Sequence, residues 1–222
     1  MKTLIKIANF LEYLSKILRW KVRNKKYKKF MKKYKLQDSN KTKKTDRRFN
    51  PYERTDFCLI ESLIESKNIN TNDYILDIGC GTGLFLCYLA SKGFEHLTGI
   101  ELNESLYNIG CFNKSQLFKY KKTNIELLNL NALEYTDVNK FNVFYLFNTF
   151  YDKDTYVEWL RIIDKSIHEI NRKIKIIILF PTVSSMGAIS EFDWLKEKER
   201  VICKTQACYR CVNFIIYEGE LC

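Results

Sequence analysis

Two apolar patterns alternate along most of the chain. Short, largely apolar runs at 74–78, 96–101, 125–132, 142–148 and 173–180 predict buried β-strands. The segments between them carry apolar residues three and four positions apart, which is typical of helices packed on a sheet. These predicted helices cover residues 59–64, 84–90, 104–120, 153–172 and 190–196. Alternating strands and helices predict an α/β fold, with a mostly parallel sheet and helices on both faces.

The first fifty residues follow a different pattern. Residues 3–22 have apolar positions at helical spacing opposite charged ones, which predicts an amphipathic helix. Charges interrupt it too often for it to span a bilayer. A lysine-rich run with three interleaved aromatic residues covers 21–35, and residues 36–50 are polar and typical of a linker. We therefore expect a basic helical extension and linker over 1–49 and one domain over 50–222.

The stretch 74–83, Tyr-Ile-Leu-Asp-Ile-Gly-Cys-Gly-Thr-Gly, combines a strand with a glycine-rich turn. A helix follows it directly, so bare backbone and the free N–H groups of a helix start lie at the end of a strand. Ligands of open α/β sheets bind at that edge. Glu101 ends the next predicted strand, where a carboxylate can accept from both hydroxyls of a ribose. The pattern indicates a site for a nucleoside cofactor.

The glycine spacing distinguishes between cofactors. The dinucleotide fingerprint is Gly-x-Gly-x-x-Gly, whereas here Gly79, Gly81 and Gly83 stand at every second position. Asp77, two residues before the first glycine, would repel a pyrophosphate but suits a ligand with a cationic amino group. Residues 76–83 resemble motif I of the class I S-adenosylmethionine-dependent methyltransferases. The resemblance covers about residues 50–222 and implies a Rossmann-like, doubly wound, seven-stranded sheet that ends in an antiparallel pair at 201–206 and 212–217.

The same resemblance implies which residues hold S-adenosylmethionine. Asp77 would pair with its amino group, Glu101 with the ribose hydroxyls, and Asn131, where the family commonly has Asp, with the adenine. Residues 52–57 are similar to a Tyr-x-Pro-Thr-x-Tyr segment of small bacterial members, although Arg54 replaces the proline. The predicted cofactor-binding residues are Tyr52, Thr55, Asp77, Gly79, Cys80, Gly81, Thr82, Gly83, Glu101, Leu102, Asn131 and Ala132.

The acceptor is expected at the end of the fourth strand, where the family places methyl transfer. Amine methyltransferases often have Asn/Asp-Pro-Pro-aromatic there, and Asn148-Thr149-Phe150 keeps the Asn and the aromatic residue. Asn148 and Phe150 are therefore the predicted catalytic residues, while an Asn that only caps the turn is an equally good interpretation. No residue stands out as a general base, because His168 lies beside a helix face where packing explains it.

The net charge of +11 comes from one end of the chain. Residues 1–50 hold 18 lysines and arginines against 3 acidic residues, which leaves 19 against 23 for the remainder. An apolar helix face beside a lysine run is typical of a segment that binds an anionic membrane surface. The same lysines and aromatics could contact nucleic acid, which we rank lower, or form a helix packed on its own domain beside solvated charge.

Cysteine usage and the amino-terminal sequence bear on the compartment. No secretory signal is recognisable, so we expect free thiols in the cytoplasm, with peripheral contact at the inner membrane surface through residues 1–35. Cys208-x-x-Cys211 is half of a zinc pattern, but the spacing of Cys203 and Cys222 fits no standard finger. We therefore predict no metal site.

The sequence predicts a methyltransferase whose acceptor is a small molecule, lipid or glycan. Protein lysine and RNA are the alternative acceptors. Two other classes stay open: a protein that binds S-adenosylmethionine without turnover, and an NAD-dependent oxidoreductase, which the glycine spacing and Asp77 disfavour.

Overall fold

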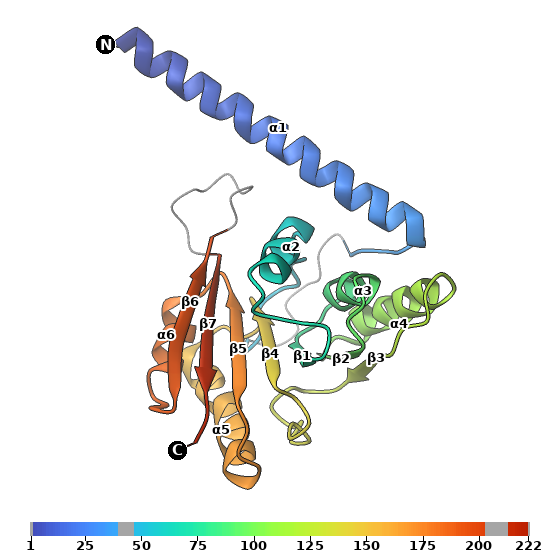
Figure 1. Ribbon diagram of the computed structural model, residues 1–222, viewed down its shortest axis with the longest axis vertical. Coiled ribbons are helices and arrows are strands. Elements are labelled where there is room, and N and C mark those ends of the chain that lie inside the picture. Colours follow the sequence, from blue (N-terminus) through green and yellow to red (C-terminus); the bar gives the residue numbers. More distant parts are fainter. Residues whose placement is uncertain (1, 40–46, 203–212, 222) are drawn as a thin grey trace.

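A single seven-stranded sheet organises the protein. The computed structural model describes residues 2–39, 47–202 and 213–221. The strand order is β3-β2-β1-β4-β5-β7-β6, and β7 is antiparallel to both of its neighbours (Figure 1). The strands are β1 Tyr74–Ile78, β2 His96–Glu101, β3 Ile125–Asn129, β4 Val143–Phe147, β5 Ile174–Leu179, β6 Leu195–Val201 and β7 Phe214–Gly219. The predicted Rossmann-like, mostly parallel, seven-stranded sheet is confirmed.

Helices cover both faces of this sheet, as predicted. In the described part of the chain they are α1 Lys2–Tyr34, α2 Phe57–Glu65, α3 Leu84–Ser91, α4 Glu104–Phe118, α5 Lys153–Glu169 and α6 Val183–Ile189. Side chains of α2, α3 and α4 and of the end of α1 form one apolar core with the sheet. Side chains of α5 and α6 form a second core on the other face.

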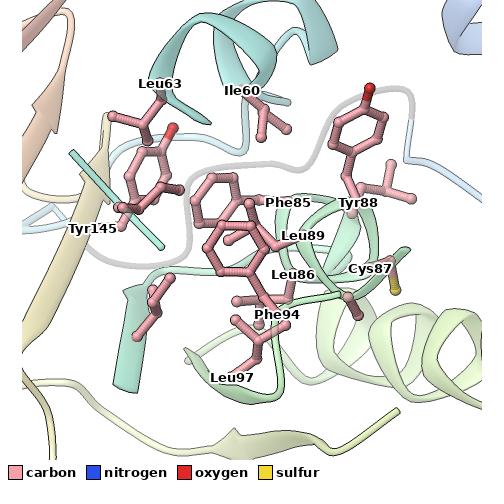
Figure 2. Packing of buried hydrophobic residues seen from close by; sticks show 14 of the residues in the cluster. Ile60, Leu63, Phe85, Leu86, Cys87, Tyr88, Leu89, Phe94, Leu97 and Tyr145 are labelled. Carbon is pink, nitrogen blue, oxygen red and sulfur yellow. The ribbon is translucent and has the colours of Figure 1, made fainter. Parts of the chain in front are cut away.

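The first core brings the helix after the glycine turn against β4. The rings of Phe85 and Tyr145 stack with their centroids 3.9 Å apart, and Ile60, Leu63 and Leu89 close around them (Figure 2). Burying a large apolar side chain stabilises a fold by about 1.5–3 kcal/mol. This packing fixes α3, and with it the glycine turn, relative to the sheet.

The strand order reverses beside β1. The chain runs from β1 outward to β2 and β3, and then returns to β4 on the other side of β1. The loops after β1 and β4 therefore leave the sheet in different directions and open a crevice at the carboxyl ends of both strands. Gly79 of the glycine turn and Asn148 both line this crevice.

The carboxyl-terminal elements differ from the prediction. Residues 190–196 were expected to be helical, but α6 ends at Ile189 and β6 begins at Leu195. The polar run in β6 is typical of a charged edge strand, whose side chains discourage pairing with another sheet. An antiparallel pair is present in β6 and β7, but its first strand, predicted at 201–206, is observed at Leu195–Val201. Most of the residues 201–206 lie outside the described part of the chain.

The amino-terminal segment is also more ordered than predicted. The lysine run is not a separate segment, because α1 continues through it to Tyr34. Leu36, expected in a linker, is buried, and both backbone groups of Gln37 bond the side chain of Asn113 in α4. The first core therefore extends across the domain boundary predicted at residue 49.

Candidate functional site

The glycine turn takes a conformation that glycine adopts easily. Gly79, Gly81 and Gly83 have φ angles of +77°, +56° and +67°, in the left-handed region that L side chains rarely occupy. The backbone N–H groups of Gly79 and Cys80 both donate to the carbonyl of Ile100 at 2.9 Å. These two bonds tie the turn to the end of β2, directly before Glu101.

Glu101 is held by two backbone groups. Its Oε2 accepts from the N–H of Gly81 at 2.8 Å, and its Oε1 accepts from the N–H of Asn103 at 2.7 Å. The side chain is only 8% exposed, and burial raises its pKa while these backbone donors oppose the increase. Each carboxylate oxygen has a further lone pair for a ligand. The two bonds aim the carboxylate at the crevice.

Asp77 is buried without a protein partner. Its side chain is 3% exposed, and none of the described residues donates a hydrogen bond to its carboxylate. It lines a small cavity of about 310 Å³ of empty space, together with Thr55, Phe85 and Tyr145. Burial raises the pKa of Asp77 well above its usual range, and the charge of Glu101 raises it further. An unpaired buried carboxylate of this kind is costly unless a cationic group meets it.

A strap of residues 48–55 covers the glycine turn. It pairs with the segment after β4: the Asn50 N–H donates to the Thr149 carbonyl, and Phe49 forms an antiparallel bridge with Phe150. The ring of Tyr52 lies so close to Gly81 that a Cβ built there would come within 2.2 Å of it. Only glycine at position 81 allows this approach.

Asp38 fixes the strap from the side of α1. Its carboxylate accepts from the hydroxyl of Tyr52 at 2.7 Å, from the guanidinium of Arg54 at 2.7 Å and from the hydroxyl of Tyr27 at 2.9 Å. Because the one proton of Tyr52 goes to Asp38, Thr82 donates its own proton to the Tyr52 oxygen, at 2.9 Å. One carboxylate thus joins α1, the strap and the glycine turn.

The larger cavity of the crevice joins the cofactor and acceptor sides of the predicted site. It encloses about 680 Å³ of empty space, part of it open to solvent. It shares Tyr52, Glu53, Gly79 and Phe147 with the small cavity that reaches Asp77. The residues that line it are Phe49, Asn50, Pro51, Tyr52, Glu53, Gly79, Ile100, Glu101, Leu102, Asn103, Leu106, Leu130, Ala132, Phe147, Asn148 and Thr149.

Most of the predicted cofactor residues gather here. Tyr52, Gly79, Glu101, Leu102 and Ala132 line the larger cavity, and Thr55, Asp77 and Cys80 line the small one. The remaining glycine-turn residues support them from outside. Gly81 donates to Glu101, Thr82 holds Tyr52, and Gly83 caps α3.

Of the three remaining predicted residues, Asn131 and Phe150 occupy positions that the sequence did not anticipate, whereas Asn148 lies at the cavity as expected. Asn131 points into its own turn, because its Oδ1 accepts from the N–H of Leu133 and its Nδ2 donates to Glu134. Asn148 lines the larger cavity, where its Nδ2 lies 3.5 Å from the carbonyl of Pro51. Phe150 lies outside both cavities at 2% exposure, in the second core. Its position argues against contact with an acceptor.

Sequence analysis missed several residues of the crevice. Thr149 donates to the carbonyl of Ile78 at 2.7 Å and so joins the ends of β4 and β1. Phe147, the last residue of β4, forms part of both cavity walls. No pattern in the sequence indicated Asp38, because its three main hydrogen-bond partners lie in α1 and in the strap, away from it along the chain. Phe147, by contrast, could have been found as the last apolar residue of the run that predicts β4.

The predicted absence of a metal site was not tested at the Cys-x-x-Cys segment. Cys203, Cys208, Cys211 and Cys222 all lie outside the described residues. Within the described residues, no three His, Cys, Asp or Glu side chains form a group able to hold a metal ion.

Comparison with known proteins agrees with this geometry. The family model of the methyltransferase domain matches residues 75–168, which contain the glycine turn, Glu101 and Asn148. This chain belongs to the class I methyltransferases. Members of the class take a methyl group from S-adenosylmethionine, and motif I is the segment from Leu76 to Gly83.

Individual relatives of this methyltransferase act on different acceptors. EEF1A lysine methyltransferase 2 of Danio rerio is 50% identical over 42 residues, which are 19% of this chain and 18% of that protein. An RNA methyltransferase from Salinibacter ruber, solved with S-adenosyl-L-homocysteine, is 14% identical with a TM-score of 0.54, over 76% of this chain and 93% of that one. Magnesium protoporphyrin IX methyltransferase from Synechocystis, solved with S-adenosylmethionine, is 11% identical with a TM-score of 0.53. That match covers 94% of this chain and 97% of the Synechocystis chain. The structural likenesses show the fold.

The residues of this methyltransferase fit its cofactor. Asp77 offers an unpaired buried carboxylate to an amino group, and Glu101 offers free lone pairs to two hydroxyls. The bound cofactor supplies an electrophilic methyl group on a sulfonium. The chain's own part is to hold donor and acceptor in line and to exclude water, which Phe147, Tyr52 and Leu130 favour by lining the crevice with apolar surface.

The predicted pairing of the cofactor's amino group with Asp77 would give the affinity a pH dependence of known sign. A cationic amino group pairs with the ionised carboxylate, and the raised pKa means that the free protein binds a proton there more readily than an ordinary Asp does. Binding must then release that proton, so affinity rises with pH. We expect S-adenosylhomocysteine to bind more tightly at pH 7 than at pH 5, with proton release measured by calorimetry in buffers of different ionisation enthalpy.

The variant Asp77→Asn is the control, because the Asp77 carboxylate makes no hydrogen bond with the described residues and the amide has the same shape. This variant should bind S-adenosylhomocysteine more weakly at pH 7, and its binding should release fewer protons. The protons still released would come from Glu101. Equal affinity and equal proton release in both proteins would contradict the role given to Asp77.

Proposed function

We propose that this S-adenosylmethionine-dependent methyltransferase acts on an uncharged or cationic acceptor that a small molecule, a lipid or a glycan presents. The observation behind this is the charge of the larger cavity. Its ionisable lining groups include the carboxylates of Glu53 and Glu101, and the described residues that line it include no lysine, arginine or histidine. Phosphate-rich acceptors need positive charge near the reacting atom. A neutral or cationic acceptor needs no such positive charge and is therefore compatible with this cavity.

Nitrogen is the atom that this lining suits best. The side-chain oxygen of Asn148 can accept a hydrogen bond from an amine, and its Nδ2 lies toward the Pro51 carbonyl. Phe147 offers the flat apolar surface that Phe150 was expected to supply. Among the described lining residues there is no histidine or cysteine, and the carboxylates that could act as a base are those of Glu53 and Glu101. A neutral amine needs no general base to expose its lone pair, so it fits this lining better than a hydroxyl does.

A protein lysine is the second candidate, since its side chain presents the same amine. The 42-residue likeness to a lysine methyltransferase supports it. The chain spans only 18% of that relative's length in this match, so the likeness does not extend to the rest of that protein. RNA is disfavoured by the acidic cavity and by the net acidic residues 51–222.

Transfer of a labelled methyl group tests the proposal. The protein is incubated with methyl-labelled S-adenosylmethionine and a cell extract, which is then separated into lipid, low-mass, glycan, protein and RNA fractions. We expect label in one of the first three, and Asn148→Ala should reduce it at least tenfold with little change in S-adenosylhomocysteine affinity. Label in protein would favour the second candidate, and label in RNA would overturn both.

Two controls sharpen this assay. Asn148→Asp keeps the shape and an accepting oxygen, and it should retain more activity than Asn148→Ala. If the parent binds the cofactor but labels no fraction, the chain is a binding protein without turnover, and the transfer proposal fails.

A further inference from the structure

The helix α1 uses one face to dock on its own domain. The rings of Phe57 and Tyr88 stack on each other, and Phe30 packs against both, with centroids 4.9 and 5.0 Å away. Tyr27 lies 5.3 Å from Phe57. Lys26 forms an ion pair with Glu61 of α2 at 2.8 Å. The aromatic residues of the lysine run are therefore committed to the domain, which removes the stacking surface that a single-stranded nucleic acid would use.

The amino-terminal half of α1 extends away from the sheet and its covering helices (Figure 1). It carries an apolar stripe, defined here as Ile7, Leu11, Leu14, Leu18 and Val22, whose side chains are 38–62% exposed. Their spacing of three and four residues places them along one line of the helix, over about 22 Å of its length. Large apolar side chains grouped in this way mark an interaction surface.

The same line of the helix continues as a basic stripe. Lys21, Lys25, Lys28, Lys29 and Lys32 follow the apolar stripe at the same spacing, and all five are exposed. At 3.6 residues per turn, Lys25 and Lys32 lie about half a turn away from Tyr27 and Tyr34. The face of α1 that points away from the domain is thus apolar in its first half and basic in its second.

We propose that this face lies flat on an anionic lipid bilayer. The apolar stripe enters the boundary between headgroups and acyl chains, and the basic stripe meets the lipid phosphates. In the described chain, no helix has both the length and the apolar content needed to cross a membrane, so α1 binds along the surface. The domain, packed on the opposite face, points into the water.

Two other occupants explain the face less well. A nucleic acid would use the lysines but would gain nothing from five exposed aliphatic side chains. A second copy of α1 could cover the apolar stripe, but a parallel pair would place the basic stripes of both copies against each other. A bilayer with anionic lipid would contact both the apolar stripe and the basic stripe. The proposal does not depend on which acceptor the enzyme methylates.

Vesicle flotation with the full chain tests it. We expect binding to vesicles of 30% phosphatidylglycerol in phosphatidylcholine and little binding to pure phosphatidylcholine. Leu11→Glu/Leu18→Glu should abolish binding, whereas Ile5→Glu/Asn9→Glu, with the same added charge on exposed positions off the stripe, should retain most of it. Lys25→Gln/Lys29→Gln/Lys32→Gln should weaken binding about 100-fold, at about fivefold for each lysine near the surface.

The matched control for the lysines is Lys119→Gln/Lys122→Gln/Lys196→Gln, which removes the same charge from exposed positions outside α1 and should weaken binding much less. Circular dichroism and S-adenosylhomocysteine binding show that each variant is folded. Equal binding to neutral vesicles, or unchanged binding by Leu11→Glu/Leu18→Glu, would overturn the proposal. Two further results would overturn it. One is tight binding to poly(U) without vesicle binding, and the other is self-association without vesicle binding that Leu11→Glu/Leu18→Glu removes.

Discussion

Replacing Glu101 with alanine is expected to weaken the binding of S-adenosylhomocysteine by between fivefold and 150-fold. The substitution removes a charged acceptor for two ribose hydroxyls, and hydrogen bonds to charged groups contribute about 1–3 kcal/mol. It also leaves the N–H groups of Gly81 and Asn103 without their carboxylate partner. Isothermal titration of the parent and the variant measures the loss.

Two further variants separate ligand contact from loss of local structure. Glu101→Gln keeps an oxygen for one backbone donor and should show an intermediate loss. Glu126→Ala removes an exposed carboxylate from the neighbouring strand β3, outside both cavities of the crevice, and should bind normally. If Glu101→Ala bound as tightly as the parent, the ribose role would be wrong.

Replacing Gly81 with alanine is expected to reduce both cofactor affinity and stability. The new Cβ would lie 2.2 and 2.5 Å from two ring atoms of Tyr52, which Asp38 and Thr82 hold in place. The positive φ adds about 1–2 kcal/mol of strain for an L residue. We expect at least a tenfold loss of S-adenosylhomocysteine affinity by calorimetry and a lower free energy of unfolding by urea titration.

The clash can be measured apart from the backbone strain. Gly93→Ala also places an alanine at positive φ, but its nearest neighbouring atom is 4.0 Å away, so it should show strain alone. In the double variant Gly81→Ala/Tyr52→Ala the ring is absent, and the two substitutions should couple favourably by about 0.5–3 kcal/mol. Strictly additive losses would show that the ring of Tyr52 does not press on Gly81.

The cofactor side of the site could be predicted because its chemistry is local in sequence. Asp77, the three glycines and Glu101 lie within two strands and the turn between them, so spacing alone brought them together. The strands β1 to β5 were predicted for a related reason: each is a short, largely apolar run. The family resemblance then added the number of strands and the antiparallel pair at the end of the sheet.

The acceptor side was predicted less well because one residue changed the direction of the chain. Asn148 has a φ angle of +51°, which breaks the alternation of side chains after β4. Thr149 therefore turns toward Ile78, and Phe150 turns into the second core. An Asn is one of the few residues that tolerate this conformation, but sequence alone does not show when it adopts it.

The strap and its support depend on contacts that a single sequence cannot reveal. Gln37 and Asn113 are 76 residues apart and meet through both backbone groups of Gln37. The prediction of the edge strand β6 was wrong for another reason, because its charged residues match a polar helix as well as they match an exposed strand. The structure of the strap and that of β6 both depend on pairing between segments that are far apart in the sequence.

The position of Asp38 also determines which fragments of this enzyme are worth making. A fragment that begins at residue 50, where the sequence placed the domain boundary, would discard Asp38 and the buried Leu36, and would expose the apolar surface of α2 and α3 that Phe30 covers. Its strap would lose the acceptor for both Tyr52 and Arg54. The smallest fragment suited to crystallisation or binding work therefore begins before Tyr27, at a point in α1 that keeps the docked turns and removes the apolar stripe.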